Sequence, residues 1–217
     1  MEFGDSFLGI LLGLGLSVAC GFRVFIPLLV TGIAAKTGNL ELAEGFTWLG
    51  EWPALIAFSV AAVTESTLYY LPIPGLGSLV DIVDAPLALI AGTILSASQV
   101  FTDMDPLLQW SLAAIAGGGS AEVLHLGTAG LRAPTAGYNP LLSVEEDAGA
   151  VTTPILAIKF LHMIPPEFIV FLLLVLLVVA VFAIKFAINR LRAIRNRLIA
   201  IREWILKRRP AETTHSL

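Results

Sequence analysis

The chain has 217 residues, of which 57% are hydrophobic and 14% are charged, and its mean hydropathy is +0.86. Soluble domains carry about 25% charged residues, so this composition excludes an ordinary water-soluble protein and predicts a chain embedded largely in lipid. Cys20 is the one cysteine, which excludes an intramolecular disulfide, a zinc site built from several cysteines and an iron–sulfur cluster.

The first apolar run, Phe7–Ala35, contains a single charged residue, Arg23. The run exceeds the ~20 residues that a helix needs to cross a bilayer, and we expect it to form the first span. An arginine at membrane depth costs at least ~2.5–3.5 kcal/mol, so Arg23 should face the protein interior and pair with an acid. Pro27, one turn later, should kink or break the helix.

The same run carries small residues at intervals of four: Gly9, Gly13, Ser17 and Gly21. A stripe of small side chains lets a second helix approach closely. We interpret the stripe as a packing surface.

Five more apolar segments follow, which makes about six spans in an all-α, polytopic membrane protein. The remaining predicted spans are Trp52–Leu71, Pro86–Phe101, Pro106–Leu131, Ser143–Met163 and Glu167 to about Ile184. Two connecting loops, Leu71–Pro86 and Leu131–Ser143, are broken by Pro and Gly yet apolar. We expect both loops to enter the membrane and to line a cavity, because irregular backbone at that depth needs protein or water around it.

Two groups of ionisable residues lie inside the predicted spans. Glu65, in the second span, is the expected partner of Arg23 because the first two spans are neighbours in sequence; it could form a structural ion pair or part of a ligand site. In the fourth span Glu122 and His125 are one helical turn apart and could share a proton, or they could only join helices through hydrogen bonds. Lys159 could pair with Glu122, but we favour its extending to the outer surface.

The sequences around Arg23 and Arg132 are weakly similar. Gly21-Phe22-Arg23 leads to Pro27, and Gly130-Leu131-Arg132 leads to Asn139-Pro140. Two sets of three spans would insert in opposite orientation, and inverted repeats with broken helices are typical of many transporters. We therefore consider an arrangement of two inverted three-helix repeats.

The end of the chain is strongly basic. Residues 185–209 contain nine Lys/Arg and one acid, whereas residues 1–184 contain four Lys/Arg and fifteen acids. Basic segments beside a span stay in the cytoplasm, and an even number of spans then places both termini there, as in a multi-pass protein of a bacterial inner membrane. We divide the chain into a transmembrane domain (1–184), a basic amphipathic helix (185–209) and a disordered tail (210–217).

The basic helix has an apolar stripe along one face. It could lie on anionic membrane lipid or pack on its own protein, or it could form a short coiled coil that makes a homo-oligomer. Nucleic-acid binding is not expected, because the topology accounts for the basic residues.

Several segments together resemble a bacterial membrane family, domain of unknown function 4126. They are GFRVFIPLLVTGIAAKTG in the first span, WLGEWPAL before the second, Glu65, HLGTAGLR from His125 to Arg132, and NPLLSVEED from Asn139 to Asp147. Tyr69 and Tyr70 stand where that family tends to have an acidic and a basic residue, and Thr128 stands where it tends to have a lysine. The resemblance implies the membrane architecture but no activity.

No HExxH, Walker A, GxSxG or CxxC motif is present, so we expect neither an enzyme nor a bound metal or cofactor. The leading hypothesis is a carrier or flippase-like transporter of a small or anionic substrate, in which the arginines attract the substrate and the acids and histidine exchange protons. The alternative is a non-transporting scaffold or regulator whose buried charges only fix helix packing. The expected substrate-binding residues are Arg23, Glu65, Glu122, His125, Arg132 and Asn139.

Overall fold

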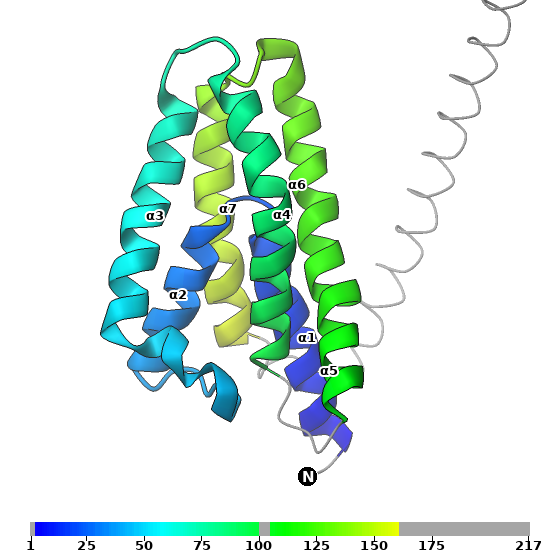
Figure 1. Ribbon diagram of the computed structural model, residues 1–217. Helices are drawn as coiled ribbons and strands as arrows, with labels where there is room; N and C mark the ends of the chain where they lie inside the picture. The colour runs from blue at the N-terminus through cyan, green and yellow to red at the C-terminus, as the bar shows by residue number, and fades with distance from the viewer. Residues whose placement is uncertain (1–2, 100–104, 161–217) are drawn as a thin grey trace, which may run out of the picture. The chain divides into compact units, whose positions relative to one another are not determined.

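A computed structural model describes residues 3–99 and 105–160, which all belong to the first of two compact units, Met1–Ile164. These residues form seven α-helices and short 3-10 and π segments, without a strand (Figure 1). The all-α prediction is therefore confirmed for this part of the chain. The predicted sixth span, the basic helix 185–209 and the tail 210–217 lie outside the described residues.

The first apolar run forms two short helices instead of one span. Helix α1 (Phe3–Ala19) has 17 residues and α2 (Phe25–Lys36) has 12. At 1.5 Å per residue α2 is ~18 Å long, which is short of the ~30 Å hydrocarbon core of a bilayer. Pro27 lies in the first turn of α2, where the missing N–H costs no helical hydrogen bond.

The two helices fold back on each other, so that both ends of the hairpin lie at the same end of the bundle. Gly9 in α1 packs on Gln99, just after α4 (Leu76–Ala97), and Ala43, after α2, donates its N–H to the Ser98 carbonyl over 2.9 Å. Figure 1 shows the turn between α1 and α2 inside the bundle. The prediction of one continuous helix over Phe7–Ala35 is thus wrong, whereas the number of crossings and the side of the termini stay predictions.

A short 3-10 segment, η1 (Glu44–Gly50), leads into α3 (Trp52–Tyr70), as predicted for the second span. The expected loop Leu71–Pro86 is mostly helical, because α4 begins at Leu76 and contains Pro86. Only the turn before α4 is irregular, and Gly75 there has φ 82°, a left-handed conformation that suits glycine.

The predicted fourth span is a continuous helical rod built from α5 (Pro106–Leu112), the π segment η2 (Ala113–Gly118) and α6 (Gly119–Arg132). A single 3-10 turn, η3 (Ala133–Thr135), leads to α7 (Pro140–Phe160), which contains the predicted fifth span as far as residue 160. The expected irregular loop after Leu131 is therefore short.

Small residues allow the helices of the core to approach closely. Ser17 donates its hydroxyl to the Gly92 carbonyl of α4 over 2.6 Å. A Cβ added at Gly92 would lie 2.7 Å from the Cβ of Ala121 and 2.9 Å from the Gly117 carbonyl oxygen. The interpretation of the stripe on α1 as a packing surface is confirmed, and the glycines before α6 serve the same purpose.

The outer surface of the bundle is apolar along much of its length. By length and composition α4 is the one described helix that could cross a membrane alone, and α3 with η1, bent by 60°, is a second if the pair counts as one span. Large apolar side chains are exposed on several helices, among them Ile56, Val60, Val63, Ile82, Ile115, Val123 and Leu126. Six-span topology and inverted repeats remain predictions.

Candidate functional site

Arg23 lies in the break between α1 and α2, at the inner tip of the hairpin, and it is almost completely buried. Its Nη1 donates to Glu146 Oε2 and its Nε donates to Asp147 Oδ1, each over 2.7 Å. Both acids lie in the second turn of α7. The expectation that Arg23 points inward to a carboxylate is confirmed, although its partners belong to α7 and not to α3.

Arg132, the last residue of α6, is also fully buried and reaches the same acid. Its Nη1 donates to Glu146 Oε2 and its Nη2 to Asp81 Oδ1, a residue of α4. One carboxylate oxygen of Glu146 therefore joins two arginines that come from distant parts of the sequence. Charge-assisted bonds of this kind are about twice as strong as neutral ones.

Tyr69, near the end of α3, lies against both arginines. The guanidinium carbons of Arg23 and Arg132 lie over its ring, 4.1 and 4.4 Å from the centroid. Its hydroxyl is 2.9 Å from Asp81 Oδ1 and 3.0 Å from Asp84 Oδ2. A tyrosine has one hydroxyl hydrogen, so keeping both contacts requires that hydrogen to be shared or one carboxyl group to carry a proton.

We call these residues the ionic cluster: Arg23, Tyr69, Asp81, Asp84, Arg132, Glu146 and Asp147. Its four carboxyl groups outnumber its two guanidinium groups, so the cluster has an excess of negative charge when all are ionised. Within the described residues, the buried Glu146 Oε1 and Arg132 Nε have no hydrogen-bond partner. Unpaired buried polar atoms are costly, and the cluster therefore has capacity to bind a further polar group or a proton.

Glu65 is buried beside the cluster but does not form the expected ion pair with Arg23. Its carboxylate accepts hydrogen bonds from the backbone N–H groups of Val24 (2.8 Å) and Phe25 (3.1 Å). It thus caps the first turn of α2 from a neighbouring helix, where a negative charge also meets the positive end of the helix dipole. The prediction of an Arg23–Glu65 pair is wrong because the exposed N–H groups at the break bind this carboxylate.

His125 forms its hydrogen bond with α4 and not with Glu122, its expected partner one turn away on α6. Its Nε2 is 3.0 Å from the backbone carbonyl oxygen of Asp81. Because a carbonyl oxygen only accepts, Nε2 must carry the hydrogen, and the ring links α6 to α4 behind the cluster. Glu122 is half-buried on the same helix, and its Oε2 has no hydrogen-bond partner among the described residues.

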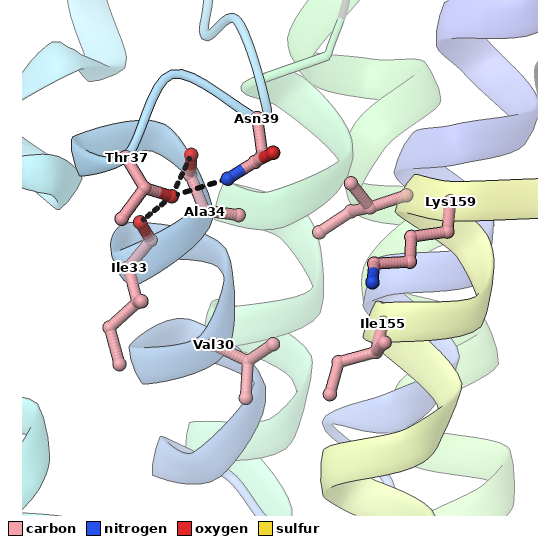
Figure 2. A pocket seen from close by; sticks show the side chains of 8 residues that line it. Val30, Ile33, Ala34, Thr37, Asn39, Ile155 and Lys159 are labelled. Carbon is pink, nitrogen blue, oxygen red and sulfur yellow. Dashed lines mark hydrogen bonds between the residues drawn. The ribbon is translucent and has the colours of Figure 1, made fainter.

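Asn139 and Lys159, two residues considered from the sequence, lie at the ends of α7. Asn139 Oδ1 accepts the N–H of Leu142 over 3.2 Å, so Asn139 caps the start of the helix. Lys159 is exposed and forms none of the ion pairs found among the described residues. It lines a hollow of about 520 Å³ between α2 and α7, together with Val30 and Ile155. Figure 2 shows these three side chains.

None of the four acids of the cluster is among the site residues expected from the sequence. Asp81 and Asp84 fall within the expected loop Leu71–Pro86, whereas in the structure they lie on one face of α4 at a spacing of three. Glu146 and Asp147 were noted only within a matching segment. A count of charged residues could have found these four acids. Two buried arginines require acids near them, and the apolar part of the chain contains few other acids.

The cluster joins the hairpin tip to α3, α4, α6 and α7. Its ion pairs and the tyrosine hydroxyl form a continuous hydrogen-bonded chain from Asp147 to Asp84. Because arginine keeps its protons, only the end formed by Tyr69, Asp81 and Asp84 can share one. No group of three or more His, Cys, Asp or Glu suited to a metal ion occurs in the described part of the chain. The buried charges of the cluster suit the binding of an ion or of a polar group.

These features define an all-helical protein in which ionised side chains are buried and apolar side chains cover the outside. The chain belongs to the family described as domain of unknown function (DUF4126), which matches residues 10–185. The resemblance seen in the sequence is thereby confirmed. No curated protein and no solved structure matches the chain.

Proposed function

We propose that the protein is a multi-pass membrane carrier for a small substrate and that the ionic cluster is its working centre. The observation that carries the proposal is the position of Arg23, which lies in the break between two short helices and is paired with acids of α7. Broken helices that meet inside a bundle are typical of carriers, because their free backbone ends and ionisable side chains can meet a substrate there.

The distribution of side chains supports a membrane setting. Arg23, Glu65, Arg132 and Glu146 are buried in the bundle, whereas Lys36, Glu51 and Lys159, at helix ends, are exposed. Exposed positions along α3 and α6 carry apolar side chains instead. Such an inverted pattern is unfavourable in water but favourable in lipid, where charged side chains face the protein interior.

The charges of the ionic cluster favour a positively charged substrate over an anion. Both arginines are already paired with Asp81, Glu146 and Asp147, so their positive charges are balanced within the cluster and attract an anion only weakly. The excess of carboxyl groups favours a cation or protons. We therefore modify the expectation of an anionic substrate, and we infer a carrier that exchanges protons or takes up a cation.

A transport assay tests the proposal with two neighbouring glutamates of α7. Full-length protein is reconstituted in proteoliposomes, and uptake of radiolabelled small cations, anions and neutral solutes is measured with and without a pH gradient. Glu146→Gln should abolish any uptake seen with the natural protein, because it removes the charge that both arginines share. Glu145→Gln, at an exposed position outside the cluster, should retain it. Equal uptake by the natural protein and a folded Glu146→Gln variant would remove the cluster from transport.

A scaffold without transport is the second candidate, and one observation favours it. The ion pairs tie helix elements from distant parts of the sequence to one another, which by itself would fix the packing of the bundle. The scaffold predicts that cluster substitutions lower stability while the natural protein moves none of the solutes in the assay. Uptake that depends on Glu146 would exclude it.

A further inference from the structure

A second feature lies next to the ionic cluster: a pocket of about 390 Å³ between α3 and α4. Its walls are largely apolar and include Leu68, Leu79, Val83 and Leu87. Leu79 and Val83 are 63% and 60% exposed, so the pocket opens on the apolar outer face of the bundle. Glu65 also lines this pocket, and so does Asp84.

These two acids are the part of the pocket that needs explanation. Glu65 is 4% exposed and Asp84 is 5% exposed, yet neither takes part in an ion pair with another described residue. The arginines pair with the other acids of the cluster instead. Burying a carboxylate without an opposite charge is costly, and here two such groups face one pocket.

Hydrogen bonds compensate part of that cost, but they add no positive charge. Glu65 accepts the N–H groups of Val24 and Phe25, and Asp84 Oδ2 lies 3.0 Å from the hydroxyl of Tyr69. The hydrogen bond to Tyr69 is the one that the Asp84 side chain forms among the described residues, and Asp84 lines the pocket. Acceptors are therefore present there without a cationic donor.

We propose that the pocket binds a single-chain amphiphile with an ammonium group, its head beside Asp84 and Glu65 and its apolar chain between α3 and α4. An ammonium group brings three donors and one positive charge to a site rich in acceptors. The proposal rests on the proposed function and names the substrate class of that carrier.

The dimensions and walls of the pocket argue against other occupants. Its volume lies near the lower end of the ~300–1,000 Å³ typical of ligand sites, which suits one short chain better than a two-chain lipid. An anion would meet two carboxylates. A small hydrated cation would leave the apolar walls without contacts, whereas an amphiphile covers them.

Binding of labelled octylamine tests the proposal. The full-length protein is held in nanodiscs, empty nanodiscs measure partition into lipid, and labelled octanol and octanoate serve as the neutral and anionic counterparts. Octylammonium should bind saturably above the lipid background, and the other two should not. Asp84→Asn keeps an acceptor for Tyr69 but loses the charge, so it should weaken octylammonium binding by at least about tenfold.

Two further variants separate the pocket from the fold. Val83→Phe fills the mouth without changing charge and should also weaken binding, whereas Glu145→Gln, at an exposed position outside the pocket, should leave binding unchanged. Thermal unfolding checks that Asp84→Asn and Val83→Phe remain folded. Equal octylammonium binding by the natural protein and a folded Asp84→Asn variant would overturn the proposal, as would preference for octanol or octanoate.

The outcomes for the pocket and for the carrier are distinct. Saturable octylammonium binding without uptake into proteoliposomes would support the pocket and contradict the carrier. Uptake of another solute that depends on Glu146, together with no octylammonium binding, would support the carrier and overturn the assignment of the pocket.

Discussion

Arg23 and Glu146 form a fully buried ion pair in which Nη1 and Oε2 are 2.7 Å apart. The pair joins the tip of the N-terminal hairpin to α7. Glu146 Oε2 also forms an ion pair with Arg132 Nη1. The carboxylate therefore balances positive charge from two separate segments, and removing its charge affects both at once.

We expect Glu146→Gln to lower the free energy of unfolding by ~3–5 kcal/mol, the range found when one partner of a buried pair is removed. Glu145→Gln, one residue earlier and exposed, should change it by less than about 0.5 kcal/mol. Chemical unfolding of the purified protein in detergent, followed by circular dichroism, measures both. Similar losses for the two variants would show that the ion pair contributes little.

Double-mutant cycles should show whether Arg23 interacts with Glu146, its partner in the structure, or with Glu65, the partner predicted from the sequence. Arg23→Met and Glu146→Gln should couple by ~0.5–3 kcal/mol, because the two side chains are in direct contact. Arg23→Met and Glu65→Gln should couple much more weakly, since Glu65 binds backbone N–H groups instead. The measurement is again unfolding free energy, and stronger coupling through Glu65 would contradict the observed contacts.

The cap on α2 can be tested locally. Glu65→Ala removes the acceptor of the Val24 and Phe25 N–H groups, and loss of a cap costs ~0.5–2 kcal/mol. The rate of hydrogen–deuterium exchange at the start of α2 should rise by the factor that this loss of free energy implies. The rate in the middle of α7 should change less. Unchanged exchange at Val24 and Phe25 would mean that the cap is not needed for this turn.

Two glycine substitutions should have opposite effects. Gly92→Ala places a Cβ 2.7 Å from that of Ala121, so α4 and α6 must separate and stability should fall. Gly127→Ala, on the outer side of α6 with nothing within 4 Å of the added atom, should stabilise by ~0.5–1 kcal/mol, because alanine restricts the unfolded chain. Melting temperatures measured side by side check the signs, and a gain for Gly92→Ala would contradict the close approach.

The single cysteine reports on the hairpin tip. Cys20 is fully buried three residues before Arg23, so a maleimide should label it slowly in the folded protein and quickly after denaturation. Glu146→Gln should speed labelling, because it releases the tip. Mass spectrometry over time provides the rate, and Glu145→Gln is the control. Fast labelling of the natural protein would indicate that the tip is open.

The local features of the sequence predicted α3, the rod from α5 to α6 and the start of α7 to within a few residues, and α3 has the expected bounds apart from one residue at its end. The inward position of Arg23 and the packing role of the glycine stripe also followed from the cost of burial and from small side chains. These inferences succeeded because each depends on neighbouring residues or on one energetic term.

The partners of the arginines could not be found in this way. The choice between Glu65 and Glu146 depends on the fold-back of α1 and α2, which turns the N–H groups of Val24 and Phe25 towards α3. Apolar periodicity is the same for a crossing helix and for a hairpin, so the sequence favoured a single span. The predicted third span begins at Pro86, because proline favours the first turn of a helix. In the structure Pro86 lies inside α4, so Asp81 and Asp84 are helical.

The dependence of Arg23 on α7 has a consequence for biosynthesis. The ribosome makes the N-terminal hairpin first, but among the described residues the acids that pair with Arg23 belong to the helix made last. Until α7 exists, the guanidinium lacks an ion-pair partner, and leaving water is unfavourable for it. Docking of the hairpin is therefore a late step of assembly, and chains truncated before residue 146 should keep Cys20 accessible.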